Sequence, residues 1–251
     1  NRATAVLAHG ANPGLISHLA KRALEQLAQD HDLSITPGRW AELAQELGVQ
    51  VIQVAERDTQ TNHHQVMPGE FFNTWSVPGF ISELTQACEA GWGSHETRWP
   101  CGAEHPNTGK AASIFWPHPQ HGLMQVKSWV PSVGDSQAWL ITHNESISLA
   151  EFLTVNDTQG QLQYRPTVYF AYQPCPAAGQ SIAHWLHRNK QAPAKQHVVP
   201  LEHLSDTQRR ALILADNKIG ENASWEDDLL GIELAELKDA GFDLGLTGFS
   251  Q

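Results

Sequence analysis

The sequence contains few cysteines and no long apolar run. Its 251 residues include only 3 cysteines, an odd number and too few for a framework of disulfide bonds, which fits a reducing compartment. No apolar run approaches the ~20 residues that cross a bilayer, and the first residues lack the pattern of a signal peptide. We therefore expect a cytoplasmic protein with no membrane partner. Because the chain begins with Asn1 rather than Met and soon enters an expected strand, we also expect a fragment.

Basic residues are scarce as well. The 16 Lys and Arg residues are outnumbered by 27 Asp and Glu residues, which leaves a formal net charge of −11. Contacts to a phosphate backbone require Lys and Arg on one face, so this balance disfavours a nucleic-acid partner. It is compatible with a cationic ligand. Of the 27 acids, 11 lie in residues 199–251, so the excess acid is concentrated towards the C-terminus.

The short motifs of several common enzyme classes are absent. The sequence has no G-x-G-x-x-G after a strand, no G-x-x-x-x-G-K-[ST], no H-E-x-x-H, no C-x-x-C and no G-x-S-x-G. Cys88, His95, Cys101 and His105 are a candidate set of metal ligands, but spacings of six and five residues do not match the compact pairs of structural zinc sites. We therefore predict no metal site, and expect a buried thiol and exposed imidazoles there.

Hydrophobic periodicity predicts an α/β beginning followed by an α+β domain. Residues 1–60 are predicted to form strand 3–8, helices 13–29 and 37–47, and strand 49–55, the order of a truncated Rossmann-like unit. Residues 61–185 show short segments of period-two character, so a mostly antiparallel sheet is expected. The predicted strands there are 70–75, 112–116, 123–130, 139–143 and 163–172, and the predicted helices are 78–86 and 147–153.

The composition changes again towards the C-terminus. Residues 174–200 are rich in Pro, Ala, Gln and Lys, and we interpret residues 186–198 as a linker. From residue 199 the pattern is helical, because residues 205–208 form a capping box, residues 224–227 resemble a second one, and Gly241 ends the last helix. Residues 199–251 are therefore predicted to form a short all-α tail.

Acidic and aromatic residues near the ends of predicted strands form a candidate receptor. Glu56, Trp75 and Glu83 would suit an ammonium or diammonium ligand, because carboxylates supply the opposite charge and an indole face adds cation–π attraction. His143, close to Glu145 in the sequence, could exchange protons near neutral pH. Each residue also has an ordinary structural interpretation, because most carboxylates are solvated and most Trp residues belong to the core.

Six segments carry a more specific signal. They are HGANPGL (9–15), VAERDTQ (54–60), NTWSVPGF (73–80), GWGSHE (91–96), THNESIS (142–148) and YRPT (164–167). Together, and in this order, they resemble the bacterial homospermidine synthase family, which is similar to saccharopine dehydrogenases. The resemblance covers about residues 3–185. It implies an N-terminal Rossmann domain that holds NAD, with its glycine-rich fingerprint upstream of Asn1, and a second domain that completes the active site and forms a homodimer.

The resemblance also implies a redox-neutral reaction of putrescine. In that family NAD removes a hydride from one putrescine, ammonia is lost, a second putrescine or related diamine condenses, and the same hydride reduces the new imine. The resemblance places Asn12 beside the nicotinamide and the reacting carbon, with Pro13 as its neighbour in cofactor binding. His143 and Glu145 would relay protons, so the implied catalytic residues are Asn12, His143 and Glu145.

The same resemblance implies three substrate-binding residues. Glu56 would stand at the entrance to the amine channel, Trp75 would offer its face to the cationic intermediate, and Glu83 would hold the inner ammonium group. These are the residues that the charge and aromatic pattern singled out independently.

The tail has a resemblance of its own. Segments LSDTQRR (204–210), ADNK (215–218) and LTGF (246–249) look like the end of ParB-like nuclease domains that are found beside phage DNA methylases. The glycine-histidine-arginine segment of those domains has no match here, so no DNA-binding or nuclease role is carried over. Two alternatives to the enzyme therefore stay open: a non-catalytic polyamine-binding remnant, and a ParB-like DNA-associated accessory protein.

Overall fold

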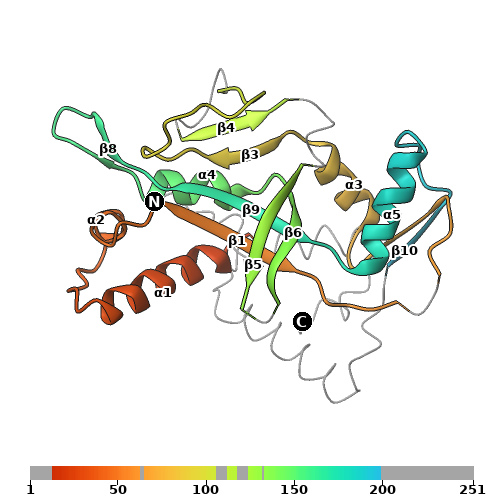
Figure 1. Cartoon of the computed structure of the whole chain (residues 1–251), viewed down its shortest axis with the longest axis horizontal. Helices are drawn as coiled ribbons and strands as arrows, with labels where there is room; N and C mark the ends of the chain where they lie inside the picture. The colour runs from red at the N-terminus through yellow and green to blue at the C-terminus, as the bar shows by residue number, and fades with distance from the viewer. Residues whose placement is uncertain (1–12, 63–64, 106–111, 118–123, 132, 199–251) are drawn as a thin grey trace, which may run out of the picture. The chain divides into compact units, whose positions relative to one another are not determined.

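The computed structural model of the chain describes residues 13–62, 65–105, 112–117, 124–131 and 133–198 (Figure 1). The chain divides into two units, residues 1–200 and residues 201–251. The predicted strand 3–8, Asn12 and the predicted all-α tail lie outside the described residues.

The first described elements are two helices and a strand. They are α1 (Leu15–Asp30), α2 (Trp40–Glu46) and β1 (Val51–Arg57), so the predicted order of helix, helix and strand is confirmed. The two helices bury their apolar sides against each other, as their 3.6-residue periodicity requires. The buried residues that form this cluster from the helices are Leu24, Ala28, Leu43 and Ala44.

A six-stranded sheet lies at the centre of the described unit. Besides β1, its strands are β3 (Cys88–Gly91), β4 (Ser113–Trp116), β5 (Gln125–Val130), β6 (Gly134–Leu140) and β9 (Thr167–Gln173). Five of them follow the order β4-β3-β9-β6-β5 with antiparallel neighbours, which confirms the predicted antiparallel sheet. β1 is the exception, because it pairs with β9 in parallel. Residues on both sides of position 60 therefore contribute to one sheet.

Strand β9 is the junction between two apolar clusters. Successive side chains of a strand point to opposite faces, so Val168, Phe170 and Tyr172 share one face. That face packs in the largest cluster, with residues of the helices, whereas Tyr169 packs in a second cluster with residues of β3 and β4. The predicted strand 163–172 is thus mostly correct, but it is divided at Pro166 into β8 (Leu162–Tyr164) and β9, because proline has no N–H for a ladder.

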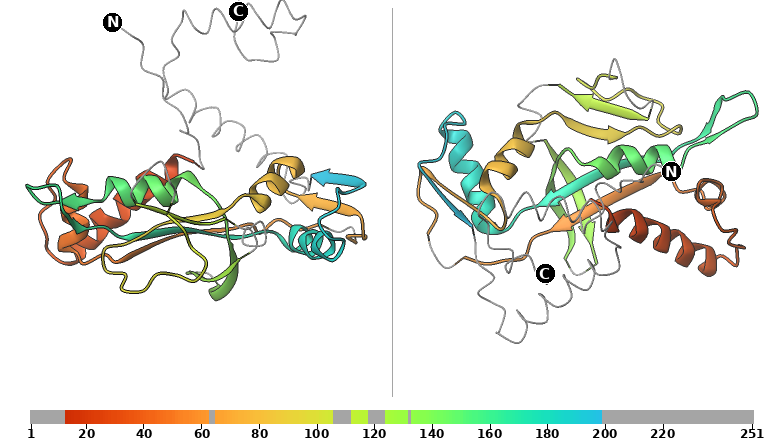
Figure 2. Two further views of the ribbon diagram at one scale, coloured as in Figure 1. Left: turned by 90° about the horizontal axis from the view of Figure 1, so that it is seen from above. Right: turned by 180° about the vertical axis from the view of Figure 1, so that it is seen from behind.

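Three further helices and three short strands complete the unit. The helices are α3 (Val77–Thr85), α4 (Asn144–Phe152) and α5 (Pro176–His187), and the strands are β2 (Glu70–Asn73), β7 (Val155–Asn156) and β10 (Lys195–Val198). Helix α4 lies along β3 and β9 (Figure 2). β2 pairs with β10 and β7 pairs with β8. Within the described ranges, no helix is long and apolar enough to cross a membrane.

The segment that carries His143 differs from the prediction. A strand was expected over residues 139–143 and a helix over 147–153, but β6 ends at Leu140 and α4 already begins at Asn144. His143 is therefore the residue that precedes the helix, and Glu145 lies in its first turn. An acidic residue is favoured at that place because the N-terminus of a helix carries partial positive charge.

The predicted linker also needs correction. Helix α5 continues to His187, and β10 occupies the end of the segment 186–198, where Gln196 pairs with Phe71 of β2. The polar composition hid this strand, because β10 is mostly exposed and its pairing partner lies more than 100 residues earlier. Strand β3 was also missed, since four residues with one charge carry too little periodicity to be recognised.

Candidate functional site

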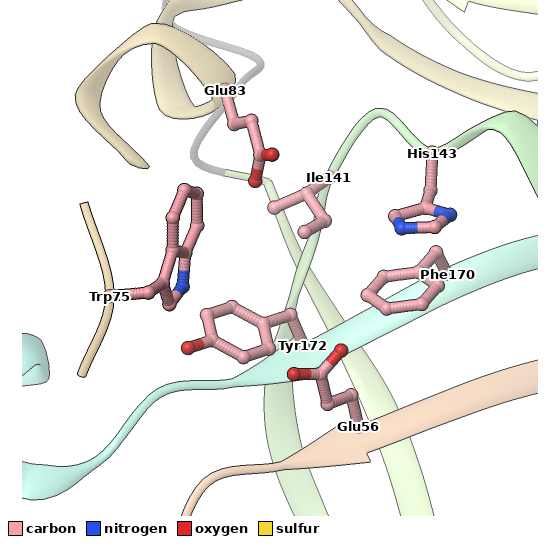
Figure 3. Close-up of a pocket in the computed structure, with 7 residues that line it drawn as sticks. All are labelled: Glu56, Trp75, Glu83, Ile141, His143, Phe170 and Tyr172. Atoms are coloured by element: carbon pink, nitrogen blue, oxygen red, sulfur yellow. The ribbon is translucent and has the colours of Figure 1, made fainter. Parts of the chain in front are cut away.

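One pocket brings together most of the residues that the sequence singled out. It has a volume of about 250 Å³ and is lined by two carboxylates, an imidazole, three aromatic rings and one aliphatic side chain. Figure 3 shows the two carboxylates pointing into the same space from opposite sides, with the indole at one end and the imidazole at the other. The lining residues are Glu56, Trp75, Glu83, Ile141, His143, Phe170 and Tyr172.

Paired strands place one side of the pocket. In the parallel β1–β9 ladder, Glu56 lies next to Tyr172 and Val54 lies next to Phe170. Phe170 and Tyr172 are two residues apart and share a face of β9, so both rings line the pocket. Glu56 is the second last residue of β1, as the sequence predicted for the carboxyl end of this strand.

Strand β2 and helix α3 place the opposite side. Ser76 caps α3 by accepting a hydrogen bond from the Gly79 N–H at 3.2 Å, and Pro78 occupies the first turn, where its missing N–H costs nothing. This cap fixes Trp75 directly before the helix. Glu83 lies two turns along the same helix, which brings it to the pocket again.

The pocket is electronegative. Of its seven lining residues, two are glutamates and none is Lys or Arg. Burial raises the pKa of the half-buried Glu83 above its usual range, and the carboxylate of Glu56 raises it further. Burial and the neighbouring carboxylate therefore destabilise the charged form of Glu83, and a nearby cation would stabilise it. This pocket suits a positively charged ligand.

His143 and Glu145 form a buried pair at the edge of the pocket. His143 Nδ1 contacts Glu145 Oε2, and the side chain of Glu145 is only 2% exposed. The other oxygen, Oε1, accepts a hydrogen bond from the Gly14 N–H at 2.7 Å. The imidazole also stacks on Phe170, with ring centroids 4.2 Å apart and an angle of 10° between the planes. These contacts orient the ring, so that Nε2 is the nitrogen available to a ligand.

The structure places only part of the predicted cofactor site. Asn12 lies outside the described residues, and Pro13 precedes the Gly14 whose N–H is bonded to Glu145. The residue that precedes α1 is therefore bonded to the carboxylate that contacts His143. The Gly14 N–H is already bonded to the Glu145 carboxylate, so it is not available to a phosphate group of a cofactor.

Sequence reasoning missed four residues of the site. Ile141, Phe170 and Tyr172 line the pocket, and Glu89 of β3 accepts hydrogen bonds from the Thr142 side chain and the His143 backbone. Burial raises the pKa of Glu89, which these hydrogen bonds partly offset. A signal for Phe170 and Tyr172 existed in the alternation of residues 168–172, but nothing in the sequence indicated which strand would lie beside them.

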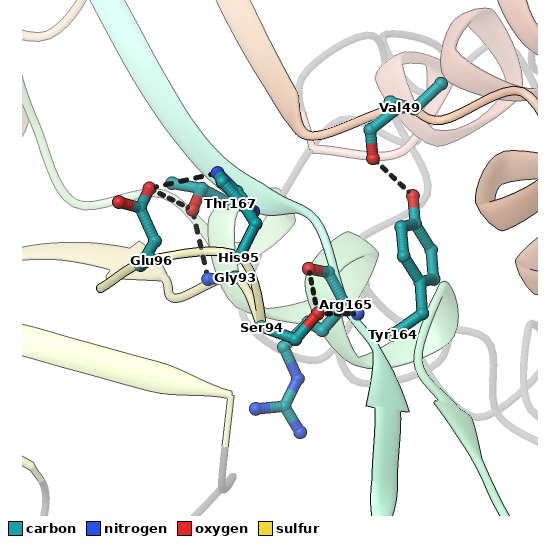
Figure 4. A network of polar contacts seen from close by, with 8 residues as sticks. All are labelled: Val49, Gly93, Ser94, His95, Glu96, Tyr164, Arg165 and Thr167. Atoms are coloured by element: carbon teal, nitrogen blue, oxygen red, sulfur yellow. Dashed lines mark hydrogen bonds and ion pairs between the residues drawn. The ribbon is translucent and has the colours of Figure 1, made fainter.

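Residues 91–96 are one of the six segments that resemble the homospermidine synthase family. None of them lines the pocket, and they form a polar network with residues 164–167 (Figure 4). Thr167 Oγ1 accepts from the Gly93 N–H at 3.0 Å and donates to Glu96 Oε1 at 2.7 Å, while His95 Nε2 lies 3.3 Å from the same carboxylate oxygen. The network ties the end of β3 to the start of β9. Among the described residues, which include all four candidate zinc ligands, no group of three or more His, Cys, Asp or Glu could hold a metal ion.

Comparison with known families identifies the chain's relatives. Residues 10–217 match the model of the saccharopine dehydrogenase C-terminal domain, which is most of the chain. The chain belongs to the saccharopine dehydrogenase C-terminal domain family. Residues 228–251 match a different model, the ParB-methyltransferase HTH domain, which agrees with the resemblance of the tail to ParB-like domains.

Within this family, the similar proteins are homospermidine synthases. The chain is 39% identical over 249 residues to the homospermidine synthase of Blastochloris viridis and 42% identical over 186 residues to that of Mesorhizobium japonicum. These matches cover 98% and 72% of this chain. They cover only 51% and 38% of the two relatives, so the chain spans about half of the length of one and less than half of the other.

A solved structure agrees with the sequence comparisons. The crystal structure of the homospermidine synthase from Legionella pneumophila in complex with NAD superposes with a TM-score of 0.72 at 43% identity. The match covers 77% of this chain and 43% of that one. The resemblance to homospermidine synthases inferred from the six segments is thereby confirmed.

Proposed function

We propose that this chain is the substrate-binding part of a homospermidine synthase that transfers an aminobutyl group between putrescine molecules. The observation that carries the proposal is the pocket with two carboxylates, an indole and no basic lining residue. A short diamine carries one ammonium group at each end, which matches carboxylates that enter the pocket from opposite sides (Figure 3). The similarity to homospermidine synthases supports the same ligand.

In this proposal three side chains bind the amine. Glu83 holds the inner ammonium group, and the charge–charge contact relieves the carboxylate that burial and Glu56 destabilise. Glu56, at the end of β1, receives the outer ammonium group. Trp75, which is 37% exposed, turns the face of its indole to the cationic carbon–nitrogen group that forms during the reaction.

His143 and Glu145 move protons in this proposal. The primary amine of the second putrescine must lose a proton before it can attack the imine of the first, and the departing ammonia must gain one. His143 Nε2 can do both, because Nδ1 rests against Glu145. The contact with Glu145 and the stacking on Phe170 fix the ring, so that Nε2 is the atom that exchanges protons with the ligand.

NAD is the proposed cofactor, and the described residues fit only its reactive end. When bound, NAD accepts a hydride from the amine-bearing carbon and returns it to the new imine, so that two putrescines yield one homospermidine and one ammonia. A pocket of about 250 Å³ has room for a nicotinamide ring or a diamine, not for a dinucleotide. The sequence has no glycine-rich fingerprint for the pyrophosphate. Asn12 and Pro13 are the proposed neighbours of the nicotinamide.

Three finer assignments belong to the same proposal. We take residues 1–60 as the end of a Rossmann-like unit that contributes β1 to the sheet of the substrate domain. The enzyme is cytoplasmic, where its small diamine substrate is available, and it forms a homodimer by analogy with the family. Size-exclusion chromatography with light scattering measures the oligomeric state directly.

Isothermal titration calorimetry with putrescine tests the proposed function. Wild-type protein should bind putrescine about tenfold or more tightly than butylamine, because one charge-assisted hydrogen bond is worth roughly 1.5–3 kcal/mol. Trp75→Ala and Glu83→Gln should weaken binding, whereas the matched controls Trp129→Ala and Glu46→Gln, at exposed positions, should not. Equal affinity for the two amines, or wild-type affinity in both pocket variants, would contradict the proposal.

This chain should bind putrescine without forming homospermidine. Because the fingerprint for the cofactor is missing from the sequence, we expect no homospermidine from putrescine and NAD, as measured by mass spectrometry. Detection of homospermidine would show that the described residues, with their neighbours in this chain, hold NAD after all.

A further inference from the structure

The indole of Trp75 is held in one orientation by three contacts, two from helix α3 and one from strand β9. Its ring packs edge-on against Phe80, with centroids 5.7 Å apart and 61° between the planes. Its N–H donates a hydrogen bond to the hydroxyl of Tyr172. Its six-membered ring lies against the first turn of α3, at Gly79. Neither Tyr172 nor Gly79 has a role in the binding scheme described so far.

Gly79 makes room for the ring. A Cβ atom at this position would lie 2.8 Å from Trp75 Cζ3, closer than real Cβ contacts allow. Gly79 lies inside helix α3 and has an ordinary helical conformation, so neither a turn nor a left-handed backbone requires a glycine here. Glycine weakens a helix relative to alanine. The close approach of the indole is the feature that accounts for it.

Tyr172 fixes the other end of the indole. It is 3% exposed, its ring packs edge-on against Phe80 with centroids 5.7 Å apart, and the β1–β9 register sets it beside Glu56. Burial, followed by the carboxylates of Asp58 and Glu56, raises the pKa of Tyr172, so the phenol stays protonated. Its oxygen accepts the Trp75 N–H while its own proton remains available for an acceptor in the pocket.

We infer that Tyr172 and Gly79 are positioning residues that set the orientation of the Trp75 indole and thereby the affinity of the pocket for an alkylammonium ligand. This inference rests on the proposed function. Cation–π attraction requires the cation to lie over the ring face, so an indole that can tilt offers less attraction at the same position. The hydrogen bond and the missing Cβ restrain the tilt from two sides.

A double-mutant cycle tests the part of Tyr172. Tyr172→Phe removes the acceptor, and Trp75→Phe keeps a ring face but removes the donor. Tyr172→Phe should weaken putrescine binding about three- to tenfold in the wild-type background, the range expected for one hydrogen bond, and less than about twofold in the Trp75→Phe background. The matched control is Tyr164→Phe, because the hydroxyl of Tyr164 is also hydrogen-bonded, as a donor to the Val49 carbonyl, away from the pocket.

Gly79→Ala tests the second restraint. The added methyl group should displace the indole and weaken putrescine binding about three- to tenfold, by the same loss of ring-face contact. The helix itself should not be weakened, because alanine is the better helix former. The control is Gly179→Ala in α5, where a Cβ would meet nothing within 4 Å. This control should bind putrescine as the wild type does.

Nuclear magnetic resonance of the indole N–H groups separates positioning from a general structural role. The chain has 9 tryptophans, and the signal lost in Trp75→Phe identifies Trp75. Tyr172→Phe and Gly79→Ala should both shift that signal, while Tyr164→Phe and Gly179→Ala should leave it in place. An unshifted Trp75 signal, or the same loss of affinity from Tyr172→Phe in both backgrounds, would overturn the inference. Absence of putrescine binding by the wild type would instead overturn the proposed function.

Discussion

Glu145 Oε1 accepts a hydrogen bond from the backbone N–H of Gly14 at 2.7 Å, across 131 positions of sequence. The bond joins the start of α1 to the first turn of α4. It leaves Oε2 for His143, so one buried carboxylate holds a helix start and orients an imidazole at the same time. Loss of this carboxylate should therefore affect both the stability of the unit and the chemistry of the pocket.

Glu145→Ala is expected to lower the free energy of unfolding by about 1–3 kcal/mol, since it leaves the Gly14 N–H buried without a partner. Glu145→Gln keeps an oxygen acceptor and should retain most of that stability. Urea unfolding followed by circular dichroism measures both. The control is Glu25→Ala, which removes only an exposed ion pair with Arg22 and should change stability by less than about 1 kcal/mol. Equal effects of Glu145→Ala and Glu25→Ala would contradict this account.

Glu83→Gln should have opposite effects on stability and on binding. The pKa of Glu83 is raised in the folded state, so between its ordinary value and the raised value the folded chain binds more protons than the unfolded chain. Stability therefore falls as pH rises through this window. Glu83→Gln removes the charge, so at pH 7 its Tm should exceed that of the wild type, and the difference should vanish below about pH 4.5.

The same substitution should cost putrescine affinity at pH 7, by about tenfold or more, because the ion pair with the ammonium group is lost. Wild-type binding should also weaken as the pH falls towards the raised pKa of Glu83, at a higher pH than an ordinary glutamate would give. Isothermal titration calorimetry at several pH values measures this change in putrescine affinity. A variant that is less stable than the wild type at pH 7, or whose affinity is unchanged, would contradict the assignment of Glu83.

Gly91→Ala should destabilise the unit by about 1–3 kcal/mol or more, through overpacking. A Cβ at Gly91 would lie 2.2 Å from Ala150 Cβ and 2.5 Å from the Ser146 carbonyl oxygen, both on α4. The methyl group would push α4 away from β3, and Glu145 would move with it. Thermal unfolding measures the effect. Gly179→Ala serves as the control and should gain up to about 1 kcal/mol, because it is an open helical position. A neutral Gly91→Ala would contradict the close packing of α4 on β3.

One of the three cysteines should react with a thiol reagent in the folded protein. Cys101 is exposed, whereas Cys88 and Cys175 are buried. Burial raises the pKa of Cys88 to about 11 and also raises that of Cys175, so both thiolate forms are scarce near neutral pH. Titration with a chromogenic disulfide should show one fast thiol, and three after denaturation. Two fast thiols in the folded chain would contradict the described packing.

Much of the fold followed from local sequence signals. The 3.6-residue periodicity of residues 13–29 and 37–47 predicted two helices, and the observed α1 and α2 lie within one to three residues of these bounds. Predictions failed where a segment carried weak local information. Strand β3 is four residues long, and β10 is a polar edge strand; both exist because a distant strand supplies hydrogen-bond partners.

The candidate site shows the same division. The sequence by itself singled out candidates for a cation receptor, because charge and ring type are properties of single residues; they are Glu56, Trp75, Glu83, His143 and Glu145. Only the tertiary structure decided how they meet. The β1–β9 register sets Tyr172 beside Glu56, Phe170 stacks on His143, and the indole of Trp75 reaches the Tyr172 hydroxyl. Such pairings depend on strand register and helix packing, which arise from the burial of many side chains together and are not encoded in any one segment.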